Sequence, residues 1–163
     1  MMNAAYLLIG GNLGNRVHNL AKARMNIEND LGAIIKVSSI YETASWGITE
    51  QPDFLNQVLL IQTKFSAEEI MQSILSIENK MGRIRTEKNA SRIIDIDILF
   101  FNDEIINQKD LTIPHPEIQN RKFALIPLNE IAPHFLHPVF KQSIQNLLST
   151  SKDKLEVRPL NDL

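Results

Sequence analysis

The sequence contains no cysteine, which excludes disulfide bonds, a thiol nucleophile and zinc sites built from thiolates. Aromatic residues make up only 6% of the chain, and Trp46 is the single tryptophan. No apolar run approaches the length of about 18 residues that a membrane-spanning helix needs. The first residues also lack the basic segment and long apolar stretch of a signal peptide. We therefore expect a cytoplasmic protein that makes no membrane contact.

Neither sign of charge is in large excess, since the formal net charge is −2. A global positive field that would attract nucleic acid is thus absent. Apolar residues account for 44% of the chain and charged residues for 22%, which is typical of globular proteins. A length of 163 residues is enough for one domain with a substantial core. We expect a single domain over 1–163 that acts as a monomer on small molecules.

Hydrophobic periodicity predicts an α+β fold. Strands are expected at 4–9, 34–41, 54–65 and 93–101, and helices at 15–31 and 66–81. Ser66 and Glu69 form a capping box at the start of the second helix. The order β-α-β-β-α-β is that of a ferredoxin-like fold, an antiparallel sheet with helices packed on one face. A short return strand after 102–103 and extra C-terminal helices near 124–131 and 143–150 follow, and the tail 151–163 is expected to be partly loose.

A basic segment runs directly into a pair of acids. Residues 80–92 hold five cations and one carboxylate, and Asp95 and Asp97 follow in the predicted strand 93–101. Residues two apart in a strand share a face and lie about 7 Å apart. Two such carboxylates suit one Mg²⁺, or two ions about 3.5–4 Å apart, while the cations suit phosphate oxygens. The pattern predicts a site for a polyphosphate and its metal, and an ordinary solvated strand face is the alternative for the acids.

The glycine-rich segment 10–14 follows a predicted strand but lacks the Gly-Lys-Ser/Thr ending of a Walker A loop. By itself it indicates a tight turn.

Phe54 and Asn56 share a face at the start of the predicted strand 54–65. An aromatic plate beside an amide suits a flat heterocycle with an amidic edge. Core packing for Phe54 and a hydrogen-bonded polar side chain at a strand edge for Asn56 are the alternatives.

The segment around two prolines near residue 115 combines an imidazole, a guanidinium and an aromatic ring. His115 lies between Pro114 and Pro116, and Arg121 and Phe123 follow within a few residues. This context makes His115 a candidate hydrogen-bond donor to phosphate. Glu78 lies late in the predicted helix 66–81, where a solvated side chain is the ordinary interpretation.

Taken together, these motifs resemble the 6-hydroxymethyl-7,8-dihydropterin pyrophosphokinase family of folate biosynthesis. The most specific match is 88–99, Lys-Asn-Ala-Ser-Arg-Ile-Ile-Asp-Ile-Asp-Ile-Leu. Supporting matches are 10–14, 38–43, 51–56, 78–85, 114–115 and 120–123. The resemblance implies a reaction in which the hydroxymethyl oxygen of the pterin attacks the β-phosphorus of ATP, so that the pyrophosphoryl group is transferred and AMP leaves.

The resemblance also implies roles for particular residues. Asp95 and Asp97 would hold two Mg²⁺ ions and, with Arg83 and Arg92, form the catalytic group. The ATP site would include Glu78, Arg83, Arg85, Lys88, Arg92, Ile98, Thr112, His115 and Arg121. The pterin site would include Thr43, Ala44, Trp46, Phe54, Asn56, Asp95 and Phe123. Many relatives carry Trp or Tyr where this chain has Asn89.

Two other functions fit parts of the sequence. A different Mg²⁺-dependent phosphoryl or nucleotidyl transferase would share the carboxylate pair but not the pterin-side residues. An RNA-binding module with a ferredoxin-like sheet would need aromatic side chains on the sheet face and a basic surface. Asp95 and Asp97 in mid-strand would repel RNA, so the sequence favours a small-molecule enzyme.

Overall fold

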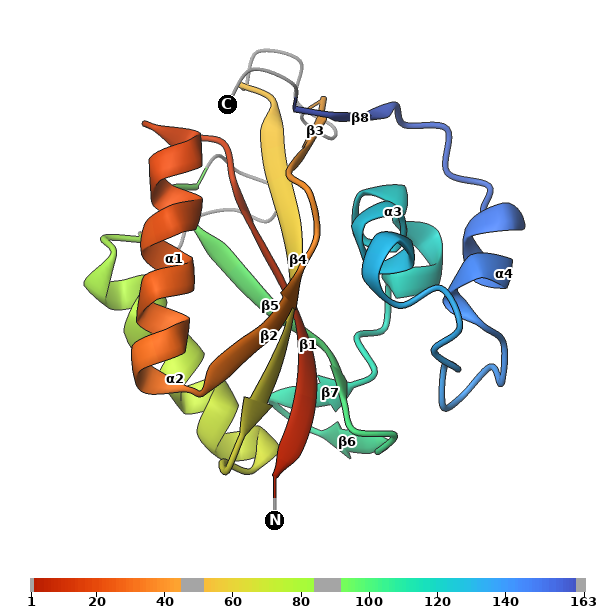
Figure 1. Ribbon diagram of the computed structural model, residues 1–163, viewed down its shortest axis with the longest axis horizontal. Helices are drawn as coiled ribbons and strands as arrows, with labels where there is room; N and C mark the ends of the chain where they lie inside the picture. The colour runs from red at the N-terminus through yellow and green to blue at the C-terminus, as the bar shows by residue number, and fades with distance from the viewer. Residues whose placement is uncertain (1, 45–51, 84–91, 161–163) are drawn as a thin grey trace.

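The computed structural model describes residues 2–44, 52–83 and 92–160, which form an α+β structure around an antiparallel sheet (Figure 1). The strand order is β5-β1-β4-β3-β8, and β2 also pairs with β4. No helix in the described part of the chain has the length and apolar character needed to cross a membrane. The predicted fold class, α+β with an antiparallel sheet, is confirmed.

The central strand β1 (Asn3–Gly11) pairs antiparallel with β4 (Phe54–Thr63) on one side and β5 (Asp95–Phe101) on the other. The predicted strand 34–41 is two strands, β2 (Ala33–Val37) and β3 (Tyr41–Thr43), and both pair with β4. The side chain of Ser38 explains the break, because its hydroxyl oxygen accepts from the Val58 N–H at 3.0 Å in place of a backbone carbonyl.

Two helices cover one face of the sheet, as predicted. These are α1 (Arg16–Asp30), capped by Asn15, and α2 (Ala67–Lys80), whose Ser66–Glu69 capping box is present. Both are amphipathic, so their apolar sides pack on the inward-facing residues of the strands. The buried cluster includes Leu7, Ile9, Leu20, Ile27, Ile70, Ile74, Ile77, Ile94, Ile96 and Ile98.

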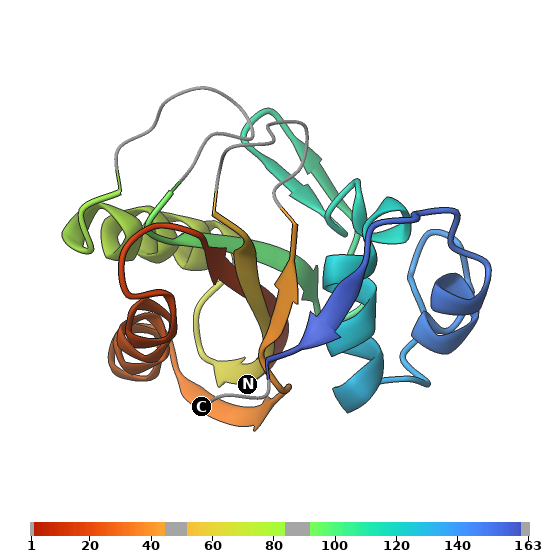
Figure 2. The ribbon, with the colours of Figure 1, turned by 90° about the horizontal axis from the view of Figure 1, so that it is seen from above.

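The C-terminal helices lie on the opposite face of the sheet (Figure 2). They are α3 (Lys122–Ile131), which follows the short 3-10 helix η1 (Ile118–Asn120), and α4 (Ile144–Ser149). They pack on Leu8, Val58, Leu99 and Phe100. The sequence prediction had helices on one face and did not place these, whereas the structure shows a sheet covered on both sides.

An irregularity in β5 gives this second face its aromatic core. The β1–β5 register shifts between Tyr6 and Leu7, so that Tyr6 pairs with Phe100 and Leu7 with Ile98. Leu99 and Phe100 both join the α3 side, although consecutive strand residues normally alternate. The hairpin of β6 (Ile106–Gln108) and β7 (Leu111–Ile113) follows, and the backbone N–H of His115 then donates to the Leu99 carbonyl at 3.0 Å.

The expectation of a loose tail is wrong for 151–160. Strand β8 (Val157–Pro159) pairs with β3, and the Leu160 N–H donates to the Ile40 carbonyl at 2.9 Å. Exposure alternates along the segment, with Lys152 and Lys154 outward and Asp153 and Leu155 half-buried. This alternation of exposed and half-buried residues is typical of a strand. Because the exposed positions are charged, the sequence alone did not indicate one.

Glycine at position 11 lets β1 approach the chain that enters β5. A Cβ built on Gly11 would collide with the backbone carbonyl oxygen of Ile93. Because that atom is backbone rather than a flexible side chain, one of the two segments would have to move.

We expect Gly11→Ala to lower the free energy of unfolding by about 3 kcal/mol, the upper range for overpacking. Gly14→Ala is the matched control, because its Cβ would meet nothing nearer than 3.6 Å and its cost comes from a φ of +71° alone, about 1 kcal/mol. Urea denaturation of both variants measures the difference. Equal losses would show that the Ile93 contact is not restrictive.

Candidate active site

A cavity of about 550 Å³ opens between the sheet and α3. The residues that line it come from six separate parts of the chain. They are Leu8, Gly10, Thr43, Ala44, Phe54, Asn56, Arg92, Asp95, Asp97, Glu117, Asn120, Arg121, Phe123, Asp153 and Leu155. The fold therefore brings the predicted carboxylate pair, two predicted arginines and most of the predicted heterocycle contacts into one place.

The floor of the cavity is a row of residues across three strands. Gly10 of β1 pairs with Asp95 of β5 on one side and with Asn56 of β4 on the other. Residues directly opposite each other on neighbouring strands point to the same face. A Cβ on Gly10 would collide with the side-chain oxygen of Asn56, so glycine leaves the space between the carboxylate and the amide open.

Asp95 and Asp97 share the cavity face of β5, and the side chains of Ile94, Ile96 and Ile98 lie in the core on the other side. Burial, and then the negative charge of Asp95, raise the pKa of Asp97 to about 7, although Arg121 and Arg83 act in the opposite direction. Within the described residues, nothing donates a hydrogen bond to Asp97. Its charge is thus the one in the pair that a bound cation would stabilise most.

Arg83 joins Asp95 to a buried glutamate. Its guanidinium donates to Asp95 Oδ1 at 2.6 Å and to Glu78 Oε2 at 2.8 Å. Glu78 is only 3% exposed and also accepts from the Ile96 N–H at 2.8 Å, so the solvated interpretation is wrong. Glu78 fixes both β5 and Arg83. The Nε of Arg83 is buried without a partner in the described part of the chain, and it remains as a donor.

Arg92 occupies the other side of Asp95. Its Nη1 donates to Asp95 Oδ2 at 3.2 Å, and its guanidinium carbon lies 5.8 Å from the centroid of the Phe54 ring. Arg121 adopts the same relation to Phe123, at 5.6 Å. The two aromatic side chains predicted to hold a heterocycle are therefore each covered by a cation that also lines the cavity.

Asn12 anchors the backbone at Arg92 and was missed by the sequence analysis. Its side-chain oxygen accepts from the Arg92 N–H at 2.9 Å, its own N–H donates to the Arg92 carbonyl at 3.0 Å, and its amide donates to the Pro52 carbonyl at 3.0 Å. Asn12 is 1% exposed. An amide side chain directly after the Gly-Gly end of a strand was the available signal.

His115 is held as a neutral donor. Its Nδ1 accepts from the Glu117 N–H at 3.1 Å, so the proton of the neutral ring is on Nε2. Burial, and then the charge of Arg121, lower the pKa of His115 to about 4. A proton on Nε2 gives His115 the ability to donate a hydrogen bond without carrying charge at neutral pH.

Some predicted site residues lie elsewhere. Residues that do not line the cavity are Glu78, Arg83, His115, exposed Thr112 on β7 and buried Ile98. Trp46, Arg85, Lys88 and Asn89 lie outside the described residues. Asp153 and Leu155 line the cavity but were not predicted.

The carboxylate pair suits a metal that takes few protein ligands. No group of three or more His, Asp or Glu side chains able to hold a metal occurs within 2–44, 52–83 and 92–160. Mg²⁺ is usually bound through one or two carboxylates together with substrate phosphates. Asp95 and Asp97 lie on one face of β5 beside the cavity, where a cation would offset the repulsion between the two carboxylates, so the residues present fit this ion.

We expect Asp97→Asn to stabilise the metal-free protein more at pH 8 than at pH 5. The folded-state pKa of about 7 lies above the ordinary aspartate value of 3.8, so the folded protein loses stability as the pH rises between these values. Asparagine removes that loss. About two pH units of that window lie between pH 5 and pH 8, so thermal unfolding should show a difference of roughly 9 °C, which corresponds to about 3 kcal/mol. The exposed Asp30→Asn should show no such dependence, and equal shifts at both pH values would contradict the burial of charge at Asp97.

We expect Glu78→Ala to lower the free energy of unfolding by about 3 kcal/mol, because it leaves Arg83 and the Ile96 N–H short of an acceptor. Glu68→Ala on the same helix removes an exposed carboxylate and should cost less than about 0.5 kcal/mol. Urea denaturation compares the two. Similar losses would show that Glu78 does not support β5.

Comparison with known proteins places this cavity in context. The profile of the 7,8-dihydro-6-hydroxymethylpterin-pyrophosphokinase (HPPK) family matches residues 6–133. The 2-amino-4-hydroxy-6-hydroxymethyldihydropteridine pyrophosphokinase of Aquifex aeolicus is 38% identical over 144 residues, covering 88% of this chain and 89% of that protein. The protein of the same name from Synechocystis is 37% identical over 147 residues, covering 90% of this chain and 75% of its own.

Solved structures show the same fold. Plasmodium falciparum HPPK-DHPS with pteroate matches with a TM-score of 0.77 at 20% identity, over 91% of this chain and 42% of that chain. Among relatives by sequence, a folic acid synthesis protein of Schizosaccharomyces pombe is 37% identical over 145 residues, and the match covers 20% of that protein's length. Because the family profile covers residues 6–133 and the Aquifex protein is matched along most of both chains, this chain belongs to the HPPK family.

Proposed function

We propose that this protein transfers the pyrophosphoryl group of ATP to the hydroxymethyl group of 6-hydroxymethyl-7,8-dihydropterin, releasing AMP, in folate biosynthesis. This is the activity of the family to which it belongs. The observation that carries the assignment to a site is that one cavity combines the Asp95–Asp97 pair with Phe54 and Phe123. The first pair suits a metal-bound polyphosphate, and the second suits a flat ring.

Asp95 and Asp97 would hold Mg²⁺, and we propose two ions. Bound there, the metal would neutralise phosphate charge and orient the reacting groups. The protein's own contribution is positioning. Asp95 is fixed from both sides by Arg83 and Arg92, so the carboxylate keeps one orientation before any substrate arrives.

Cations around the carboxylates would receive the phosphates of ATP. Arg92 and Arg121 line the cavity, the buried Nε of Arg83 is an unused donor, and neutral His115 offers Nε2–H. Thr112 and Ile98 would border the adenosine. Since the side chain of Ile98 lies in the core, Ile98 would contribute backbone atoms of the edge strand β5. Glu78 would act indirectly by holding Arg83. We also propose phosphate contacts for Arg85 and Lys88.

The opposite end of the cavity would bind the pterin. Phe54 and Phe123 would stack on the ring, and Asn56, buried beside Gly10, would pair with its amidic edge. Thr43 has a buried hydroxyl with no partner in the described residues, so it has an unused donor near this edge. Ala44, Trp46 and Asp95 would complete the contacts. Arg92 and Arg121 would leave the rings as the pterin stacks, and would then be available to phosphate.

We further propose that the chain acts as one domain and as a monomer in the cytoplasm. Both core clusters pack on the same sheet, which supports one cooperative unit.

The test is to incubate the protein with ATP, Mg²⁺ and the pterin and to identify the nucleotide product. AMP is expected, and ADP would instead indicate a simple kinase. Asp95→Ala and Asp97→Ala should each lower kcat roughly a hundredfold or more, because each removes a metal ligand. Asp30→Ala, an exposed acid in an ion pair with Lys80, should leave kcat unchanged. Normal turnover of either cavity variant at saturating Mg²⁺ would refute the metal assignment.

A further inference from the structure

We propose that the C-terminal segment 151–160 forms one wall of the pterin site and contributes to pterin binding. Asp153 positions Phe123, and Leu155 supplies an apolar surface to the ligand. The inference rests on the proposed function, because it concerns the same heterocycle. It is carried by residues that no motif of the sequence marked, and it assigns a role to a segment that the sequence alone predicted to be loose.

Asp153 caps a helix that has no local cap. The first residue of α3, Lys122, donates its backbone N–H to Asp153 Oδ2 at 2.9 Å, although the two are 31 residues apart. The N-cap residue of α3, Arg121, makes no side-chain cap, whereas α1, α2 and α4 are capped by the side chains of the residues that precede them. A carboxylate at a helix N-terminus satisfies a free N–H and favours the helix dipole.

The residues on either side of Lys122 are the ones that matter for the ligand. Arg121 and Phe123 both line the cavity. The Asp153 bond therefore fixes the point of the backbone from which these two side chains leave α3. Without it, the first turn of the helix would fray more readily, and the position of the Phe123 ring would depend on its packing against the core alone.

Leu155 is directed into the cavity by the same aspartate. The other oxygen, Asp153 Oδ1, accepts from the Leu155 N–H at 3.0 Å, and Ser151 Oγ accepts from the Asp153 N–H at 3.2 Å. The half-buried Leu155 lines the cavity, and its neighbours Lys154 and Glu156 are exposed. One carboxylate thus holds the helix that carries Phe123 and the apolar side chain beside it.

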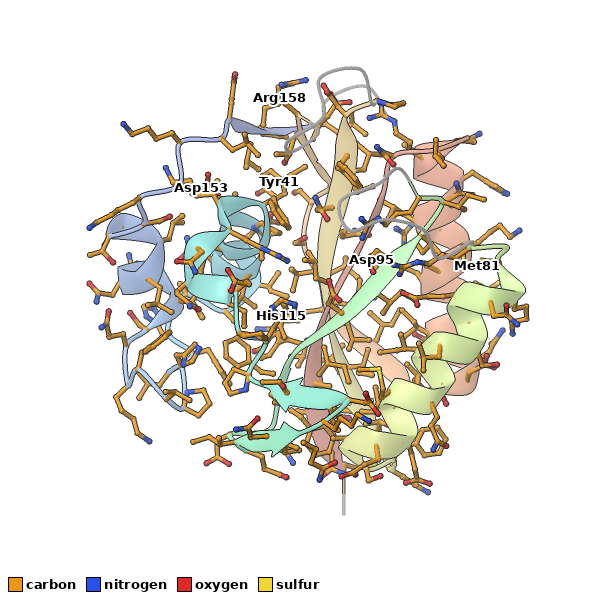
Figure 3. All side chains as sticks on the ribbon, turned by 180° about the vertical axis from the view of Figure 1, so that it is seen from behind. Tyr41, Met81, Asp95, His115, Asp153 and Arg158 are labelled. Atoms are coloured by element: carbon orange, nitrogen blue, oxygen red, sulfur yellow. The ribbon has the colours of Figure 1, made fainter. Side chains whose placement is uncertain are left out.

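The far end of the segment is fixed to the opposite wall. β8 pairs with β3, and Arg158 donates to Glu42 at 3.2 Å and to Asp53 at 3.0 Å. Glu42 precedes Thr43, and Asp53 precedes Phe54, both of which line the cavity. Figure 3 shows Asp153 beside α3 and Arg158 on β8. The segment therefore spans the cavity from the Phe123 side to the Phe54 side.

A slot that is already at the right width binds a flat ligand without the cost of ordering its walls. The segment lies on the side assigned to the pterin, and its described residues make no hydrogen bond or ion pair with Asp95, Asp97 or Arg83. Its loss should therefore weaken binding of the pterin more than binding of ATP, because Arg121 is the only proposed phosphate contact that adjoins Lys122.

The test compares Asp153→Ala, Asp153→Asn and Leu155→Ala with the unchanged protein. Steady-state kinetics should show that KM for the pterin rises about tenfold in Asp153→Ala and several-fold in Leu155→Ala, while KM for ATP stays within about twofold. Asp153→Asn keeps an acceptor oxygen and should restore KM for the pterin to within about threefold. Calorimetric titration of the pterin, with a non-hydrolysable ATP analogue present, should show the same order of Kd.

Two controls separate positioning from stability. Ser66→Ala removes the cap of α2, far from the cavity, and should lower Tm as Asp153→Ala does without changing KM for the pterin. Lys154→Ala changes the exposed neighbour of Leu155 and, as the second control, should leave KM for the pterin unchanged. If Asp153→Ala lowers Tm but leaves pterin KM and Kd unchanged, or raises both KM values equally, the inference is overturned. Failure of the unchanged protein to form AMP would overturn the proposed function instead, and the calorimetric Kd values would still decide the role of Asp153.

Discussion

Repulsion between two carboxylates on one strand is the constraint on which the site depends. Asp95 and Asp97 share a face of β5, and among the described residues Arg83 and Arg92 form ion pairs with Asp95. Asp97 has a pKa raised to about 7 by burial and by its neighbour. The structure holds Asp95 rigidly and leaves the unfavourable charge of Asp97 to be offset by a cation. Arg83 and Arg92 hold Asp95, and Glu78 in turn holds Arg83. The glycine at position 10 leaves the space between Asp95 and Asn56 open.

The two faces of the sheet have different tasks. The α1–α2 face is a continuous aliphatic core in which Ile94, Ile96 and Ile98 secure β5 from below. The α3 face is apolar at the end of the sheet near Phe100 and opens into the cavity at the end near Gly10. The irregularity at Leu99 helps to build this second face, because it turns Leu99 and Phe100 to the same side and its carbonyl receives the His115 N–H. Rigid packing below and an open cavity above let one strand serve stability and binding together.

Long-range polar contacts connect the parts of the site that the sheet does not. Asn12 joins Pro52 to Arg92 through its amide, and so relates the entry of β4 to the entry of β5. Asp153 and Arg158 relate α3 to β3 and β4 in the same way. In each case a single side chain fixes two segments that are distant in sequence. Such contacts explain how a cavity lined from six parts of the chain keeps one shape.

The sequence by itself determined the two locally capped helices, the strands around β1, β4 and β5, and the placement of Asp95 and Asp97 on one face. The two helices with local caps and the shared face of Asp95 and Asp97 depend on periodicities of a few residues, so they could be predicted, as could the clustering of Phe54, Asn56, Arg121 and Phe123 through the family resemblance. Tertiary structure decided what depends on partners far along the chain. Contacts across 18 or more residues decide the split at Ser38, the burial of Glu78, the side of the sheet on which α3 packs and the order of the tail. No local pattern of the sequence encodes such contacts.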